Sequence, residues 1–256
     1  MSSADLAFWG LALLASFLVG ASKGGLPLVG VLSVPLLSLV MPAGQAAGLT
    51  LPIYILSDVY GLWIYRQEFD KRNLAILIPA GAIGILAGYL TAHITNEDMV
   101  KFLVALIGLA YCADAVSKTW RTVPTKPADL PRGIFWGTIA GFTSFVSHAG
   151  GPPYNMFVLP QRLSKMIYAG TTTIVFAAVN LMKLPPYIAL GQVNLGSLQI
   201  CAVLAPLALF GAWAGYRLTT VVPEKLFFRA VEITLFLVAL LLLDESVPHL
   251  WAMWRN

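Results

Sequence analysis

Long runs of apolar residues recur along the chain and leave very few folds open to it. A helix needs about 20 apolar residues to cross the hydrocarbon core of a bilayer, and lipid-exposed backbone must form its hydrogen bonds within its own segment. Only 11% of the residues are charged, against roughly 25% in soluble domains. The sequence therefore predicts an all-α integral membrane protein with about eight transmembrane helices. The runs cover residues 6–20, 46–65, 74–92, 102–117, 133–147, 166–182, 196–216 and 226–243.

Two further apolar runs, 28–40 and 154–160, are too short to cross a bilayer comfortably. Each follows a Gly-Gly-x-Pro motif, "GGLP" at 24–27 and "GGPP" at 150–153. Glycines can end one helix, and proline suits the first turn of the next. The sequence therefore predicts two re-entrant or broken half-helices, one after each motif.

A polar loop at 118–132 separates two halves that share short motifs in the same order. We predict an internal duplication, with repeat 1 at 1–117 and repeat 2 at 133–256 forming one transmembrane domain. The matching places Asp58 opposite Asn180, and the small-xxx-small spacing of "GILAGYL" and "GAWAGYR" suits close helix packing. The matched motifs are "KGGLP" (23–27) with "AGGPP" (149–153), "AGLT" (47–50) with "AGTT" (169–172), and "IPAGAIGILAGYLT" (78–91) with "APLALFGAWAGYRLT" (205–219).

Loop charges bear on the orientation of the two copies, because cytoplasmic loops collect Lys and Arg. For this comparison Lys183 is assigned to the loop that follows the apolar run 166–182. Parallel and inverted copies both place a similar excess of basic residues on one side of the membrane. Arg229, one step inside the last run, favours inverted copies, which is our working prediction.

The two Gly-Gly-x-Pro breaks are the strongest indication of a binding site. A helix start leaves backbone N–H groups without intrahelical partners and carries partial positive charge, which favours an anion. Interrupted segments at matching positions of two halves are typical of transporter sites. We expect an anion site near mid-membrane where the two breaks face each other; the alternative is a kink whose lysine reaches the interface. The expected contacts are Ser22, Lys23, Gly24 and Gly25 from the first break and Ser147, His148, Gly150, Gly151 and Asn155 from the second.

Two matching threonines, Thr50 and Thr172, are expected to add hydroxyls to this site, unless they bond back to their own helices. Asp58 lies inside an apolar run, where an ionisable residue is a functional hypothesis by default. It could pair with Lys23 or carry a proton. His148 is a second proton-coupling candidate, because histidine titrates near neutral pH. The alternatives are an Asp58 solvated near the headgroups and a His148 fixed by hydrogen bonds.

The sequence lacks the residue patterns that other classes of function require. No GxxxxGK[ST] motif for nucleotide phosphates occurs, which favours a secondary transporter over a pump. His93, His148 and His249 lack metal-ligand spacing, and Cys112 and Cys201 stand alone in apolar runs, so we expect no metal and no cofactor. The net charge of +4 comes from basic residues in loops, which topology explains without nucleic acid. We expect no enzyme activity, with an intramembrane enzyme and a non-transporting membrane subunit as the alternatives.

The chain resembles the TauE/SafE family of sulfite exporters. The resemblance rests on the first Gly-Gly-x-Pro break, on the matching break in the second half and on the duplicated set of about eight apolar segments. The resemblance implies a multi-pass protein of the inner (plasma) membrane of a bacterium or archaeon. It also implies export of small sulfur-containing anions, sulfite or organosulfonates such as sulfoacetate. Ala149 stands where the first break has Lys23, so only the first break can contribute a lysine cation at this position. The substrate within this class, the direction, the coupling ion and the oligomeric state stay open. The motif residues carried over are Lys23, Gly24, Gly25 and Pro27, and Gly150, Gly151 and Pro153.

Overall fold

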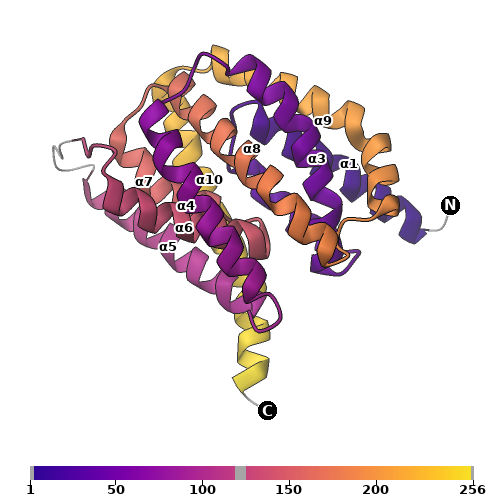
Figure 1. Ribbon diagram of the computed structural model, residues 1–256. Coiled ribbons are helices and arrows are strands. Elements are labelled where there is room, and N and C mark those ends of the chain that lie inside the picture. The colour runs from indigo at the N-terminus through magenta and orange to yellow at the C-terminus, as the bar shows by residue number, and fades with distance from the viewer. Residues whose placement is uncertain (1–2, 119–124, 255–256) are drawn as a thin grey trace. The chain divides into compact units, whose positions relative to one another are not determined.

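Every regular element in the described part of the chain is a helix. The computed structural model describes residues 3–118 and 125–254, and no strand occurs in those two ranges. The all-helical prediction is therefore confirmed over them (Figure 1). The helices are α1 (Ser3–Lys23), η1 (Val29–Leu32), α2 (Ser33–Ser38), α3 (Ala43–Ile64), α4 (Lys71–Leu90), α5 (Glu97–Lys118), α6 (Leu130–Ser147), α7 (Gly151–Val158), η2 (Leu159–Gln161), α8 (Lys165–Ala189), α9 (Leu195–Val221) and α10 (Glu224–Trp254).

Six helices of the described ranges are long and apolar enough to cross a membrane. They are α1, α3, α4, α8, α9 and α10. The apolar runs 102–117 and 133–147 also form helices, α5 and α6. The chain is thus a multi-pass membrane protein, while the number of eight crossings stays a prediction.

Both short apolar runs form short helical pieces after a break in the chain. The first motif ends α1 and leads into the 3₁₀ turn η1 and the short helix α2. The second motif follows α6 and leads into α7 and the 3₁₀ turn η2. With 6 residues in α2 and 8 in α7, neither piece is long enough to span a bilayer. The breaks therefore lie where the glycines and prolines predict them.

Helix α8 extends further than the apolar pattern indicates. The assignment of Lys183 to a loop is wrong, because α8 continues through it to Ala189 and includes Pro185 and Pro186. Prolines are tolerated inside membrane helices, since neighbouring groups satisfy the freed backbone carbonyls. Lys183 is buried, so it does not belong among the loop charges used to compare orientations.

The described helices form two compact units, and each unit takes helices from both halves of the sequence. Unit 1 comprises Met1–Asp70 and Ser164–Phe227, and unit 2 comprises Lys71–Leu163 and Phe228–Asn256. Unit 1 therefore holds α1, η1, α2, α3, α8 and α9. Within it, α3 contacts α1, α8 and α9 (Figure 1).

Glycines allow α1 and α9 to pack closely in unit 1. A β-carbon added at Gly20 of α1 would overlap the carbonyl of Ala208 on α9. In return, a β-carbon at Gly211 of α9 would overlap the carbonyl of Phe17 on α1. The small-xxx-small spacing of "GAWAGYR" thus serves close backbone contact.

Unit 2 contains a similar pair, formed by α4 and α6. A β-carbon at Gly84 would overlap the carbonyl of Thr138, and one at Gly141 would overlap the carbonyl of Gly81. Helices α4 and α9 carry matching motifs of the two halves, and α1 and α6 each precede a break. The close pairs of the two units therefore join segments that the sequence matching makes equivalent. Whether the copies are parallel or inverted stays a prediction.

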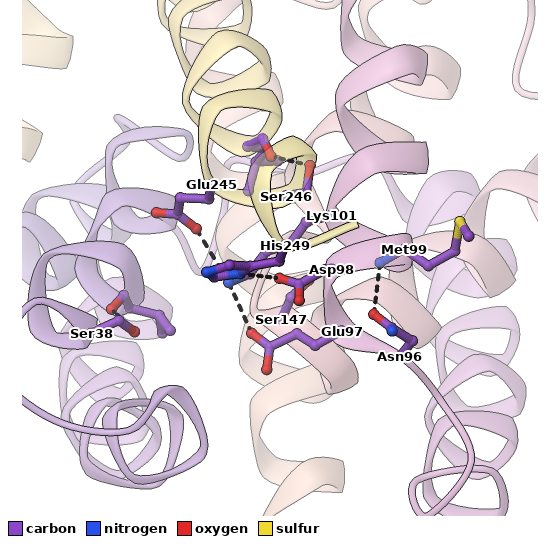
Figure 2. Close-up of polar contacts among 12 residues, drawn as sticks. Ser38, Asn96, Glu97, Asp98, Met99, Lys101, Ser147, Glu245, Ser246 and His249 are labelled. Carbon is purple, nitrogen blue, oxygen red and sulfur yellow. Dashed lines mark hydrogen bonds and ion pairs between the residues drawn. The ribbon is translucent and has the colours of Figure 1, made fainter. Parts of the chain in front are cut away.

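A polar cluster joins the start of α5 to α10 in unit 2 (Figure 2). Lys101 Nζ lies 3.1 Å from a carboxylate oxygen of Glu97 and 3.2 Å from one of Glu245. Nδ1 of His249 lies 3.2 Å from Asp98 Oδ1. Burial alone would lower the pKa of Lys101, but the two carboxylates outweigh it and the pKa is raised. Lys101 therefore stays a cation that ties the two helices together.

Candidate functional site

The first break is a tightly capped helix end. Gly25 has a φ of 118°, which residues with a β-carbon rarely adopt. Its N–H donates to the carbonyl of Ser22 at 3.4 Å, and the N–H of Leu26 donates to the carbonyl of Ala21 at 3.2 Å. This pair of bonds is the Schellman motif, which ends many helices at a glycine. Backbone geometry alone thus explains Gly25.

The amides of this break are engaged within the chain. Besides the amide of Gly25, the N–H of Gly24 donates to the carbonyl of Gly20 at 3.0 Å. An N–H has one hydrogen to donate, so amides bonded in this way offer little to a ligand. The positive charge at the first break therefore comes chiefly from Lys23, the last residue of α1.

Lys23 forms a buried ion pair with Asp58 of α3. Its Nζ lies 2.8 Å from Asp58 Oδ1, and each side chain is only 5% exposed. The other carboxylate oxygen, Oδ2, accepts a hydrogen bond from Asn180 Nδ2 of α8 at 2.8 Å. Buried charges are tolerated where they are paired and hydrogen-bonded in this way. Asp58 thus pairs with Lys23, one of the outcomes that the sequence left open.

Aromatic rings flank the ammonium group of Lys23. Its Nζ lies 5.0 Å from the ring centroid of Tyr54 and 5.9 Å from that of Phe176, within the range of cation–π attraction. The Tyr54 hydroxyl donates to the carbonyl of Gly30 at 2.6 Å, and the Ser33 hydroxyl donates to the same oxygen at 2.7 Å. These bonds to the turn after the break hold the Tyr54 ring beside the lysine.

A second lysine, Lys183, belongs to the same group. It follows Asn180 by about one turn on α8 and is 0% exposed. Lys183 is close enough to Asp58 and Lys23 to interact electrostatically with both. Its Nζ lies 5.9 Å from the ring centroid of Tyr187. We call Lys23, Asp58, Asn180 and Lys183 the buried charge cluster.

The donor set of this cluster suits an anion rather than a metal cation. Metal sites in proteins are built from carboxylates, imidazoles and thiolates, whereas the cluster has two lysines, one amide and one carboxylate. In the part of the chain that the structure describes, no group of three or more His, Cys, Asp or Glu residues could hold a metal ion.

The second break belongs to unit 2 and is capped differently. His148 ends α6 in the left-handed region, with a φ of 53°, and its N–H donates to the carbonyl of Ser144 at 3.2 Å. The Ser147 hydroxyl donates to the carbonyl of Thr143, also at 3.2 Å. His148 and Asn155 are both buried. The two breaks therefore match in position along the halves but not in capping residue.

A comparison with protein-family models identifies the family of this multi-pass chain. The family model described as sulfite exporter TauE/SafE matches residues 11–242. The chain belongs to the TauE/SafE family. Comparison with curated proteins and with solved structures gives no match. TauE/SafE membership makes this a membrane protein of a transporter family rather than of an enzyme family.

The TauE/SafE chain brings part of the predicted site together. Lys23 and Asp58 meet, whereas the hydroxyls of Ser22, Thr50 and Thr172 donate to carbonyls three or four residues earlier on their own helices. For the threonines this back-bonding is the alternative that the sequence left open. The remaining predicted contacts belong to unit 2, so their part in the same site stays a prediction. They are Ser147, His148, Gly150, Gly151 and Asn155.

Sequence reasoning missed three residues at the first break: Tyr54, Thr173 and Lys183. The Thr173 hydroxyl donates to the carbonyl of Lys23 at 3.4 Å, although Thr172 was the expected contact. The sequence does contain a pattern that indicates this helix face, because polar residues recur along it at helical spacing. They are Thr173, Asn180, Lys183 and Tyr187. The pattern is visible only if α8 is extended past residue 182, through Pro185 and Pro186.

Proposed function

We propose that this TauE/SafE member is a secondary transporter that exports small sulfur-containing anions across the inner (plasma) membrane. Its substrates on this proposal are sulfite or organosulfonates such as sulfoacetate. Family membership supports the class of protein. The observation that carries the proposal is the buried lysine at the end of a broken helix, Lys23, inside an apolar helical unit. An ionisable residue within a membrane segment marks a transport pathway by default.

The buried charge cluster suits an oxyanion. The ammonium groups of Lys23 and Lys183 and the side-chain NH₂ of Asn180 are all hydrogen-bond donors. Sulfite and sulfonates present several negatively charged oxygens as acceptors, and charge-assisted hydrogen bonds are the stronger kind. In the structure the carboxylate of Asp58 holds two of these donors, Lys23 Nζ and Asn180 Nδ2. We propose that a bound anion takes over contacts that Asp58 now makes.

We further propose that the second break completes the site from the other half of the chain. Its contribution comes from Ser147, His148, Gly150, Gly151 and Asn155, with His148 as a second proton-coupling candidate beside Asp58. Inverted repeats with eight crossings and a broken helix in each copy would allow one half to rock against the other. The matching order of motifs in the sequence supports this part of the proposal.

The membrane potential favours export of an anion. Each negative charge that leaves a cell with a negative interior gains about 2.3 kcal/mol per 100 mV. Uniport is therefore sufficient for net export, and a coupled proton changes the net charge moved in each cycle.

Flux into liposomes that contain only this protein tests the proposal. We expect uptake of labelled sulfite or sulfoacetate, lost in the Lys23→Ala/Asp58→Asn double variant. The control is Lys225→Met, which changes an exposed lysine and retains uptake. Folded protein that moves no sulfur oxyanion would favour a non-transporting subunit, and chemical conversion of the added anion would favour an intramembrane enzyme.

A further inference from the structure

Three helix ends meet at one end of unit 1. The end of α3 lies against the start of α8, where a β-carbon at Gly170 would overlap the carbonyl of Glu68. The start of α8 also contacts the end of α9, because Lys165 Nζ donates to the carbonyl of Thr220 at 3.0 Å. The end of α3, the start of α8 and the end of α9 therefore share this end of the unit (Figure 1).

The opposite end of unit 1 holds the start of α3 and the link between α8 and α9. A β-carbon at Gly48 on α3 would overlap the carbonyl of Gln192 in that link. Helices α3 and α9 therefore run towards the first end, and α8 runs away from it. Because α3 and α8 carry matching motifs of the two halves, their opposite directions favour inverted copies.

Basic side chains of unit 1 gather at the first end. Among its lysines and arginines, Lys23 and Lys183 are buried, and all the others lie beside the end of α3, the start of α8 or the end of α9. These others are Arg66, Lys165, Arg217 and Lys225. At the opposite end, the links 39–42 and 190–194 contain no charged residue. We call the first end the basic end of unit 1.

Acidic residues also occur at the basic end, but Asp and Glu contribute little to the orientation of a membrane protein. They are Glu68, Asp70 and Glu224.

Two Arg–Trp pairs lie near the basic end. The guanidinium carbon of Arg66 is 5.5 Å from the ring centroid of Trp63 on α3, and that of Arg217 is 5.8 Å from the ring centroid of Trp213 on α9. Trp63 is 62% exposed and Trp213 is 46% exposed. Tryptophan is enriched at both membrane–water interfaces, whereas arginine is attracted to anionic headgroups. The pairs therefore suit a headgroup layer that carries negative charge.

Unit 2, considered by itself, has the same asymmetry. The side chains of Asn73 at the start of α4 and Gln161 of η2 exchange hydrogen bonds at 2.8 and 3.0 Å. The N–H of Lys126, shortly before α6, donates to the carbonyl of Pro160 at 3.1 Å. These segments share one end, whereas the link 91–96 at the other end of α4 contains no lysine or arginine. The basic residues at the shared end are Lys71, Arg72, Lys126, Arg132 and Arg162.

We propose that the basic ends of both units face the cytoplasm and contact the anionic headgroups of the inner leaflet. Cytoplasmic segments of membrane proteins collect Lys and Arg, and an anionic leaflet attracts each such residue near its surface by about 1 kcal/mol. The rule concerns the summed charge, so no single lysine or arginine decides the orientation. The orientation does not depend on which anion the protein carries.

The orientation places the buried Lys23–Asp58 pair nearer to the cytoplasm. At about 1.5 Å per residue, Asp58 lies about 9 Å along α3 from Ile64 at the basic end and about 22 Å from Ala43 at the opposite end. Lys23 meets it at the same level, 2.8 Å from its carboxylate. If the proposed function holds, the pair lies nearer to the side from which an exporter takes its substrate.

Single cysteines at the two ends of α3 test the orientation of unit 1. Gln67→Cys at the basic end and Gln45→Cys at the opposite end both replace exposed glutamines. Each would be made in the full chain with Cys112→Ser and Cys201→Ser, and bacterial cells would be treated with a membrane-impermeant maleimide before and after permeabilisation. We expect Gln45→Cys to be labelled in intact cells and Gln67→Cys only after permeabilisation.

A second pair of exposed positions tests unit 2 in the same way. Thr125→Cys lies at its basic end and His93→Cys beyond the other end of α4. We expect His93→Cys to be labelled in intact cells and Thr125→Cys only after permeabilisation. Labelling of either basic-end cysteine in intact cells would overturn the proposal. Maleimide labelling measures no flux, so the proposed function stands or fails separately in the liposome assay.

The headgroup contact has its own measurement. The unfolding temperature of the purified protein would be compared in mixed micelles that contain phosphatidylglycerol, which is anionic, or phosphatidylcholine, which is neutral overall. We expect a higher value with phosphatidylglycerol, and a smaller difference between the lipids in the Arg66→Gln/Arg217→Gln variant. Equal values in the two lipids for the wild-type protein, or an unchanged difference in the variant, would contradict binding of anionic headgroups at the Arg–Trp pairs.

Discussion

Asn180 donates a hydrogen bond to Asp58 at 2.8 Å, and these two residues hold matching positions in the two halves of the sequence. The contact joins α3 to α8, helices that carry the matching motifs "AGLT" and "AGTT". Where the halves meet, one contributes a carboxylate and the other its neutral amide counterpart. The contact therefore has a charged group on one side and a neutral group on the other. The two breaks differ in the same way, with a lysine at the first and Ala149 at the second.

Exchanging these two residues should preserve most of the stability. Asp58→Asn alone removes the partner of buried Lys23 and should cost about 3–5 kcal/mol. Asn180→Asp alone places two carboxylates within hydrogen-bond distance and should also destabilise the protein. The Asp58→Asn/Asn180→Asp double variant returns one carboxylate to the cluster, so its unfolding temperature in detergent should lie well above that of either single variant. Additive losses in the double variant would show that the two positions do not share one partner.

Gly25 should tolerate no side chain. Gly25→Ala places a β-carbon at a φ of 118° and against the hydroxyl of Thr219, so we expect a loss of about 1–3 kcal/mol in unfolding free energy. Gly10→Ala is the matched control, because Gly10 lies within α1, the helix that Gly25 terminates, and a β-carbon there meets nothing within 4 Å. The control should be neutral or stabilising by roughly 0.5–1 kcal/mol. Equal effects at both positions, measured by thermal unfolding, would rule out the capping role of Gly25.

Replacing Ser57 should affect anion binding without lowering the stability of the folded protein. Its hydroxyl is 0% exposed and has no hydrogen-bond partner among the described residues, an arrangement that costs about 1–3 kcal/mol. Because this buried hydroxyl lies on the helix that carries Asp58 and is left without a partner, we predict that it donates to the bound anion. Ser57→Ala should leave the unfolding temperature unchanged or higher and reduce the additional stabilisation that sulfite provides. A lower unfolding temperature with an intact sulfite effect would mean that the hydroxyl is structural.

Lys101 should contribute to stability equally across the neutral pH range. Its raised pKa in the folded protein means that its ion pairs stabilise fully below the ordinary lysine pKa of about 10.4. That stabilisation is lost only as the pH rises through the folded value. Lys101→Met should therefore lower the unfolding free energy by about 2 kcal/mol, equally at about pH 6 and about pH 8. Lys71→Met, which changes an exposed lysine of unit 2, should have little effect at either pH.

Much of the architecture follows from the sequence because it depends on local rules. Apolar runs of membrane length must become helices, and Gly-Gly-x-Pro must interrupt them. The close helix pairs follow from glycines at small-xxx-small spacing, as at Gly84 and Gly211. The meeting of Lys23 with Asp58 was one of several hypotheses, and it follows from the need of a buried charge for a partner.

The parts that escaped prediction depend on three-dimensional context. Lys183 followed by Pro185 and Pro186 has the local pattern of a helix end, yet packing keeps α8 helical through all three. The amides of Gly24 and Gly25 were expected to face an anion, but whether a helix end is closed by its own chain depends on the Schellman geometry. Neither outcome can be read from residue order alone.

The most direct test of the account is calorimetric titration of the purified protein with sulfite, comparing wild type, Lys23→Met and Lys225→Met. If Lys23 is the principal cation of the anion site, Lys23→Met should weaken sulfite binding by roughly tenfold or more, while Lys225→Met binds as the wild type does. Sulfite binding of equal strength in all three folded proteins would contradict the placement of the anion at the buried charge cluster.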